Sequence, residues 1–275
     1  RIAVGRFAAL MSLSLGRLLC GTIARSGAAT SLHAAAAAII LAFFGRSDTM
    51  CQRQSGARRD KGDDMTGDTE HRRDLAAALR YSAKLGLNEG IANHFSLALS
   101  PDGARFLMNP YGRHWSQMRA SDLLLLDAMG DPGGRDDLDP TAWAIHSALH
   151  RRLPQARCIM HLHSKYATVL ACLQNPTLPP IDQTTMRFFN RIAFDNGFDG
   201  MGLGDEAERI AGCLGNRRVL LMGQHGVLVA GAGVAECFDT IYYFERAADT
   251  YITALSTGQA LNIASDAVAE KTARQ

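Results

Sequence analysis

The sequence predicts an α/β protein in which helices cover both sides of a mixed or mainly antiparallel sheet, and three observations support this class. Segments with helical and with strand periodicity alternate along residues 65–260. Residues 91–110, IANHFSLALSPDGARFLMNP, contain two alternating runs joined by turn residues, which predicts an antiparallel hairpin and excludes an all-parallel sheet. Residues 157–163, RCIMHLH, are apolar enough for a buried strand.

The other elements follow from periodicity and from glycine, proline and capping residues. An opening helix is expected over residues 69–85, with Gly86 as its stop signal. Residues 121–131 are predicted to form a capped turn and a buried strand, and Asp139 before Pro140 marks the start of a helix that runs to Leu153. The later predictions are helices over 166–174, 204–216 and 233–255, a loop over 175–183, and one buried strand over 217–231 that is broken by Gly223 and Gly226.

Composition and charge limit the partners of this chain. Its 275 residues are 47% hydrophobic and 20% charged, which is typical of a globular protein. Residues 1–64 hold nine Lys and Arg against four acidic residues, so the rest of the chain holds 20 basic against 23 acidic residues. Binding several phosphates requires a basic surplus, so we expect a small-molecule substrate and neither a nucleic-acid nor a membrane partner. Six scattered cysteines without a C-x-x-C pair favour reduced, buried thiols and a cytoplasmic location.

Residues 1–64 differ in composition from the rest, with five arginines and no acidic residue before Asp48. Three interpretations remain open: an extension upstream of the true start, a targeting segment, and a structured extra domain. The apolar run over residues 34–44 is too short to span a bilayer, which takes about 20 residues. We expect a low-complexity extension over 1–64 that is disordered, cleaved or upstream of the true start, then one domain over 65–260 and a tail over 261–275.

Two histidines stand one residue apart in the predicted strand 157–163. Because side chains alternate between the two sides of a strand, His161 and His163 share a face at a spacing of roughly 7 Å, close enough to bind one ion. Metal ligation and a pair of buried neutral histidines with hydrogen-bond partners are both open from this pattern alone.

A third histidine, His225, stands at the end of an apolar strand, between Gln224 and a glycine that allows a sharp turn. His-x-His on one strand and a histidine at the end of another can supply the three imidazoles of a catalytic divalent site with an open coordination position. Three nitrogens suit Zn²⁺, Mn²⁺ or Fe²⁺. We expect one divalent ion per subunit, with Zn²⁺ as the first choice.

These residues belong to a series of motifs that resembles the class II aldolase/adducin family over about residues 70–256. The motifs are GLNEGIANHFSLAL, FLMNPYGRHWSQMRASDLLLLDAMG, IHSALHRRLPQARCIMHLHSKYATVLA, LLMGQHGVLVAG and YYFERAA, in that order. The resemblance implies a three-layer α/β/α fold around a mainly antiparallel sheet and a metal held by His161, His163 and His225. It also implies a homotetramer with sites between subunits.

The sequence departs from the sugar-phosphate aldolases of this family at their acid/base glutamate. Nineteen positions before His161 stands Ala142, which cannot move a proton. The family's serine pair, Gly-Asn and Thr-Gly, which serve phosphate binding, are replaced by Pro140-Thr141, Asn93-His94 and Tyr111-Gly112. We therefore expect a non-phosphorylated substrate.

Other residues must then move the proton if the reaction is aldol cleavage, in which a well-placed base contributes roughly 10²- to 10⁴-fold. The candidates are His94, His114 and Tyr111, although His94 could equally cap the hairpin and His114 could be a solvated loop residue. The candidate substrate-binding residues are Asn93, Gly112 and Arg113. Arg113 or Arg187 could grip a substrate carboxylate, and a solvated or ion-paired arginine is the ordinary alternative.

His146 and His150 lie four residues apart and therefore on one face of the predicted helix. His146 matches a position that is often histidine in the family, and we expect it to hold a metal ligand in its tautomer. His150 is expected at the surface, and Tyr242 and Glu245 are expected to serve helix packing.

The predicted function is that of a divalent-metal-dependent carbon–carbon lyase, aldolase-type or decarboxylating, with a small oxygenated substrate and a role in carbohydrate metabolism. Decarboxylation of a metal-chelated keto or hydroxy acid needs an electron sink but no base to break a C–H bond, so Ala142 favours it. One alternative is a non-catalytic, adducin-like binding or assembly module, which the missing carboxylate supports and the three ligand positions oppose. An Fe-dependent oxygenase is the other alternative.

Overall fold

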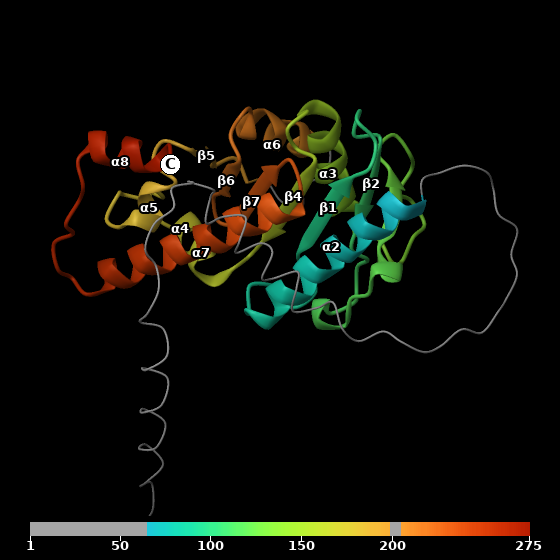
Figure 1. Ribbon diagram of the computed structural model, residues 1–275, viewed down its shortest axis with the longest axis horizontal. Coiled ribbons are helices and arrows are strands. Elements are labelled where there is room, and N and C mark those ends of the chain that lie inside the picture. Colours follow the sequence, from blue (N-terminus) through green and yellow to red (C-terminus); the bar gives the residue numbers. More distant parts are fainter. Residues whose placement is uncertain (1–64, 199–204) are drawn as a thin grey trace, which may run out of the picture. The chain divides into compact units, whose positions relative to one another are not determined.

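The computed structural model describes residues 65–198 and 205–275, with side chains from Asp68 onward (Figure 1). Residues 1–64 and 199–204 lie outside the described part, and so does the predicted N-terminal extension. Within the described ranges, no helix has both the length and the apolar character needed to cross a membrane.

The described residues contain a seven-stranded sheet with the strand order β3-β2-β1-β4-β7-β6-β5. Neighbouring strands run antiparallel except for β5 and β6, which are parallel. The strands are β1 (His94–Ala98), β2 (Arg105–Met108), β3 (Leu124–Asp127), β4 (Cys158–Leu162), β5 (Ile192–Asp195), β6 (Val219–Met222) and β7 (Gly226–Gly231).

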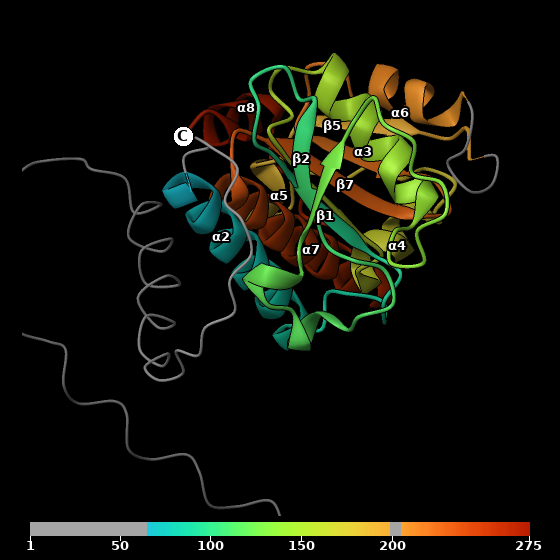
Figure 2. The same cartoon turned by 90° about the vertical axis from the view of Figure 1, so that its right-hand side faces the viewer.

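Helices cover both faces of this sheet, as Figures 1 and 2 show together. One face carries α2 (Met65–Lys84), α4 (Lys165–Ala171) and α7 (Val234–Ser256), and the other carries α3 (Pro140–Arg152) and α6 (Glu206–Leu214). The three-layer α/β/α class with a mainly antiparallel sheet is thus confirmed. Shorter helical segments are η1 (Trp115–Gln117), η2 (Ala120–Asp122), α5 (Gln183–Met186) and α8 (Asp266–Ala273).

The alternation of side chains along the strands divides the core between these faces. In β4, Met160 and Leu162 pack with Phe244 of α7 in one apolar cluster, whereas Ile159 packs with Ile210 of α6 in another. Because β4 lies between β1 and β7, both of its faces are covered and all five of its residues are buried. A central strand of this kind can place a polar side chain inside the protein on one face without disturbing the apolar core on the other.

The single broken strand predicted over residues 217–231 is wrong, because these residues form two antiparallel strands, β6 and β7, joined by a tight turn. The amide of His225 donates to the carbonyl of Met222, and Gln224 has a φ of 58°. A non-glycine residue with positive φ is uncommon, so the turn carries no strong sequence signal at that position. The reversal moves His225 to the sheet end where β4 also finishes.

The ends of the sheet also differ from the predictions. β3 was predicted to be buried, but it is an edge strand with alternating exposure, and Leu125 is 40% exposed. β5 and α8 were not predicted. Arg191 pairs with Glu270 of α8 at 3.0 Å, which ties this helix to the segment before β5.

The cysteines of the described part are free thiols. Cys158 and Cys237 are buried as the sequence predicted, whereas Cys172 and Cys213 are exposed.

Candidate metal centre

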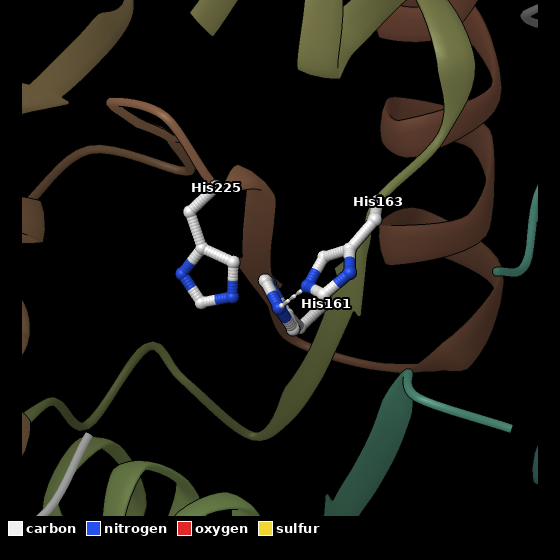
Figure 3. Close-up of side chains that lie close together, drawn as sticks. All are labelled: His161, His163 and His225. Carbon is white, nitrogen blue, oxygen red and sulfur yellow. Dashed lines mark hydrogen bonds between the residues drawn. The ribbon is translucent and has the colours of Figure 1, made fainter. Parts of the chain in front are cut away.

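Three histidines from two separate chain segments converge at one end of the central strands (Figure 3). His161 lies in β4, His163 directly follows this strand, and His225 lies in the turn between β6 and β7. One potential ligand atom of each residue lies within 4.8 Å of those of the other two. The structure therefore brings together the three imidazoles that the sequence analysis singled out as metal ligands.

The pairing of β4 with β7 brings His225 to the His-x-His strand. Leu162 lies opposite Val227 in this antiparallel pair. A Cβ atom added at Gly226 would lie only 2.4 Å from the carbonyl oxygen of Leu162, a contact that real side chains do not make. Glycine at this position is thus what allows β7 to begin so close to the end of β4.

Hydrogen bonds on the outer nitrogens orient two of the three rings. His161 donates from Nδ1 to the carbonyl oxygen of Val227 at 3.0 Å, and His163 donates from Nδ1 to Oε2 of Glu89 at 2.6 Å. In their neutral forms, both rings then carry a lone pair on Nε2, and these two atoms lie 2.9 Å apart. Two lone pairs that face each other repel, and a shared cation converts that repulsion into ligation.

The third ring has an unpartnered atom, because Nδ1 of His225 is buried and has no hydrogen-bond partner among the described residues. Burial lowers the pKa of His225 to about 4 and that of His161 well below its usual 6.5, since the charged ring loses its hydration. Neutral imidazole is the form that binds metal. Three imidazoles with facing nitrogens fit a divalent cation.

A buried carboxylate stabilises the segment that follows the His-x-His strand. Glu245 of α7 accepts hydrogen bonds from the Ser164 hydroxyl at 2.6 Å and from the backbone amides of Tyr166 and Ala167 at 2.9 and 3.0 Å. These amides belong to the first turn of α4, which has no earlier carbonyl partners for them. Glu245 thereby fixes the backbone one residue beyond His163, and its role is structural.

A second group of histidines lies between α3 and β1, beside the candidate metal ligands. His94 of β1 stands opposite His161 in the β1–β4 pair, with ring centroids 4.7 Å apart. His146 and His150 of α3 both face the sheet. His150 is only 4% exposed, so its predicted surface position is wrong: its ring donates to the Ala156 carbonyl at 2.6 Å and packs on Phe106.

His146 is buried, as a residue that supports the site should be, but its hydrogen bonds do not run to a candidate metal ligand. They run to Ser96 and to His94, which lies 2.7 Å away. Burial lowers the pKa of His146 well below 6.5 and that of His94 to about 3. The tautomers of the candidate ligands are instead set by Val227 and Glu89.

The structure separates the remaining candidate residues. Tyr111 and Asn93 line a small pocket with His94, whereas His114 caps η1 and is exposed. Arg113 forms an ion pair with Asp122 in the next segment, so its guanidinium is engaged. Gly112 lies in a turn with φ of 80°, and the space around it is open. Arg187 forms an ion pair with Asp239 of α7.

Ala142, which stands where the sugar-phosphate aldolases carry their glutamate, lines the same small pocket as His94. Its side chain packs in an apolar cluster with Phe106 and Met108. The nearest carboxylate at the start of α3 is Asp139, whose Oδ1 accepts from the amides of Thr141 and Ala142 as the helix N-cap.

Sequence reasoning missed Glu89 and Ser96 as parts of the site, and it gave Glu245 a role in helix packing alone. Glu89 and Ser96 lie within the motif GLNEGIANHFSLAL, but their partners are distant along the chain. The one available signal was the β-strand alternation, because Ser96 shares a face with His94.

Sequence and structure comparisons both relate this chain to class II aldolases. The sequence matches the profile of the Class II Aldolase and Adducin N-terminal domain over residues 73–252. It is 32% identical over 202 residues to the "Putative aldolase class 2 protein" of Caulobacter vibrioides, across 72% of this chain and 78% of that protein. It is 30% identical over 172 residues to the decarboxylase NovR of Streptomyces niveus, across 59% and 63%. The crystal structure of an aldolase II superfamily protein from Pseudomonas syringae superposes with a TM-score of 0.68 at 30% identity, across 76% of this chain and 84% of that one.

Proposed function

The chain belongs to the class II aldolase and adducin family, and we propose that it is a divalent-metal-dependent carbon–carbon lyase with a small oxygenated, non-phosphorylated substrate. The observation that carries the proposal is the convergence of His161, His163 and His225, whose potential ligand atoms lie within 4.8 Å of one another. Nothing in the packing of the fold requires three imidazoles to meet at one point, whereas catalysis by a bound cation does.

The three imidazoles would hold the ion, and a bound divalent cation supplies Lewis-acid polarisation of a substrate oxygen and stabilises the negative charge that develops there. The rings are held in place by the chain itself. The Val227 carbonyl and the Glu89 carboxylate keep two of the ring nitrogens protonated, which leaves the opposite nitrogens free to coordinate.

Decarboxylation is the reaction that these side chains support best. Aldol cleavage needs a group that takes a proton from the substrate, and Ala142 removes the family's carboxylate from the site. Loss of CO₂ from a keto or hydroxy acid bound next to a cation needs no such base. A relative at 30% identity is named as a decarboxylase, which is consistent with this choice.

An adducin-like assembly role is the second candidate, and Ala142 is also the observation that favours it. A module that only binds a partner needs no acid/base residue. Such a module would, however, have no use for the hydrogen bonds that orient His161 and His163 so that their Nε2 atoms face each other at 2.9 Å. Under either role we expect a homotetramer, which light scattering on the purified full chain would test.

The metal content of the full chain tests the proposal first. Elemental analysis after purification without chelators is expected to give about one Zn, Mn or Fe per chain. After chelation, adding Zn²⁺ or Mn²⁺ at about 100 times its dissociation constant is expected to add roughly 2.7 kcal/mol to the free energy of unfolding and to raise the Tm. A metal-free protein whose Tm does not respond contradicts the enzyme proposal.

A product assay then decides the reaction. The metal-loaded chain is incubated with a panel of small keto acids, hydroxy acids and aldol adducts, and CO₂ and aldehyde are measured. Release of CO₂ identifies a decarboxylase and release of aldehyde an aldolase. Consumption of O₂ that depends on Fe²⁺ identifies an oxygenase, and none of these signals from a metal-bound chain supports the assembly role.

A further inference from the structure

A continuous line of buried hydrogen bonds connects the backbone of Ala156 to His94. The Nδ1 atom of His150 lies 2.6 Å from the Ala156 carbonyl oxygen, and its Nε2 atom lies 2.7 Å from Oγ of Ser96. Ser96 Oγ also bonds Nδ1 of His146, and Nε2 of His146 lies 2.7 Å from Nδ1 of His94. The line thus passes through one carbonyl, three imidazoles and one hydroxyl.

The direction of every bond in this line follows from its first member. A carbonyl oxygen only accepts, so His150 carries its hydrogen on Nδ1 and accepts at Nε2. Ser96 has one hydrogen, which it gives to His150, and it must therefore accept from Nδ1 of His146. The neutral His146 ring then accepts at Nε2, and the donor is Nδ1 of His94.

The three rings are neutral because they are enclosed in the protein. His146 is fully buried, and His150 and His94 are 4% and 8% exposed. None of them has a carboxylate as a hydrogen-bond partner among the described residues. An imidazolium in such a place would lose its hydration without a compensating charge at bonding distance, which is costly.

We propose that His150, Ser96 and His146 fix His94 as the tautomer with hydrogen on Nδ1, so that its Nε2 presents a lone pair to a pocket that takes a substrate hydroxyl and excludes anionic groups. This assignment rests on the proposed function in one respect, namely that the pocket next to the candidate metal ligands receives substrate. The three supporting residues are positioning residues, because they act through His94.

The pocket has the size and the polar groups that a hydroxyl needs. Its volume is about 10 Å³, which is room for roughly one oxygen-sized group. Asn93 lines it together with His94. The Oδ1 atom of Asn93 accepts from the Glu89 amide at 2.7 Å, and its Nδ2 donor is buried without a partner in the described part of the chain. A hydroxyl can accept from Asn93 while it donates to Nε2 of His94, whereas an anion has no hydrogen to give.

The Asp139 carboxylate strengthens this selection. It lines the same pocket, and like charges in a confined site repel. A phosphate or carboxylate placed there would meet the lone pair of His94 on one side and a negative charge on the other.

The hydrogen-bond line sets a tautomer, and it does not store a proton. Passing a proton from the substrate along the line would end with a charged His150 on the buried face of α3. Burial lowers the pKa of His150 to about 4, since the charged ring loses its hydration there. A net proton on His150 is therefore unfavourable near neutral pH, and proton exchange with solvent must take another route.

The tautomers can be measured without turnover by NMR on the full chain loaded with Zn²⁺ and labelled with ¹⁵N-histidine. Two-bond proton–nitrogen correlations distinguish a protonated from an unprotonated ring nitrogen, and His94→Gln identifies the His94 signals by removing them. We expect His94, His146 and His150 all to carry hydrogen on Nδ1 alone. A His94 with hydrogen on Nε2, or on both nitrogens, overturns the proposal.

Two serine variants test whether the line itself sets the tautomer. Ser96→Ala removes the acceptor for His146, so the His94 signals should change to a mixture of both tautomers. Ser147→Ala is the matched control. Ser147, on α3, is as buried as Ser96, and its hydroxyl has no partner in the described residues. Unchanged His94 signals in a folded Ser96→Ala protein would show that the line has no such role. If that variant does not fold, the wild-type tautomers still decide the proposal.

Two probes test the selectivity of the pocket. Dihydroxyacetone, which carries a hydroxyl next to a carbonyl, should move the His94 Nε2 signal, and inorganic phosphate should not. A response to phosphate, or to neither probe, overturns the hydroxyl assignment. A metal-bound chain with the expected tautomers and probe response but without turnover would contradict only the proposed function, so the two failures can be told apart.

Discussion

The two faces of the central strands differ in character: one packs apolar side chains, and the other carries buried histidines and hydroxyls. On the α7 side, β1 and β4 contribute Phe95 and Met160 to an apolar cluster. On the α3 side, the neighbouring residues of the same strands are His94, Ser96 and His161, which form hydrogen bonds or face the candidate metal site. Since side chains alternate along a strand, a shift of one residue in register would exchange core and site.

The stability and the chemistry of this fold therefore have separate physical origins. The α7 side is held by the burial of apolar area, which is insensitive to pH and to metal. The α3 side depends on hydrogen bonds of fixed direction among buried polar groups, each of which is costly to leave unpaired. Variants on the two sides should therefore give different responses.

The largest effect is expected from His161→Ala, which removes one of the three candidate ligands on the α3 side. Metal content should fall from about one ion per chain to none, and lyase activity should fall to background, since two imidazoles do not complete the site. Elemental analysis and the product assay measure both quantities. His71→Ala, an exposed histidine on α2, is the control and should keep its metal. Metal retained in His161→Ala would show that the ion binds elsewhere.

Phe244→Ala tests the opposite side. Phe244 is fully buried on α7, so its truncation should cost about 3–5 kcal/mol of unfolding free energy in urea, through lost apolar burial and the cavity left behind. The folded fraction should bind metal with unchanged stoichiometry. Leu255→Ala, on the exposed end of the same helix, should change stability by about 0.5 kcal/mol or less. Loss of metal from folded Phe244→Ala would mean that the two sides are coupled.

A pH series on His150→Gln tests whether the α3 side encloses a neutral imidazole. The pKa of His150 is about 4 in the folded chain against 6.5 when unfolded, so the unfolded state binds the proton first as the pH falls. The stability that this provides is present above pH 6.5 and is lost between 6.5 and about 4, by roughly 1.4 kcal/mol per pH unit and about 3 kcal/mol in total. In that window, the unfolding free energy of His150→Gln measured in urea should change less steeply with pH than that of wild type, by the slope that corresponds to one proton. Parallel pH curves would disprove the buried neutral ring.

The smallest effect is expected from Glu89→Ala. The variant removes the acceptor for Nδ1 of His163, and loss of such a partner typically weakens metal affinity by about 10- to 100-fold. Because the Glu89 side chain is 64% exposed, stability without metal should change by about 0.5 kcal/mol or less. A competitive chelator titration measures the affinity, and Glu70→Ala, which changes an exposed carboxylate on α2, is the control. Unchanged affinity would mean that Glu89 does not orient the ring.

Local pattern predicted the parts of this molecule that depend on short-range physics. The period of two along β4 placed His161 and His163 on one face, and turn residues predicted the β1–β2 hairpin. Proline after Asp139 marked the start of α3 correctly. The apolar strand that ends before a glycine singled out His225 as the third imidazole, and the family resemblance then implied that all three histidines bind metal.

The parts that were missed depend on long-range packing. The reversal between β6 and β7 occurs at Gln224, whose positive φ has no sequence signature. His150 was expected at the surface, but the strand packed against α3 offers it Ser96 and encloses it. Glu89 meets His163 only because β1 and β4 are neighbours in the sheet.

The placement of the candidate ligands has a consequence for how the protein matures. A newly made chain offers an ion only the neighbouring pair His161 and His163. His225 joins them when β7 pairs with β4, which brings together the ends of a long intervening segment. Closing such a loop is entropically costly and slow compared with forming a hairpin. Tight capture of the ion is then a late event in folding, and its rate in a stopped-flow experiment would time the docking of these two strands.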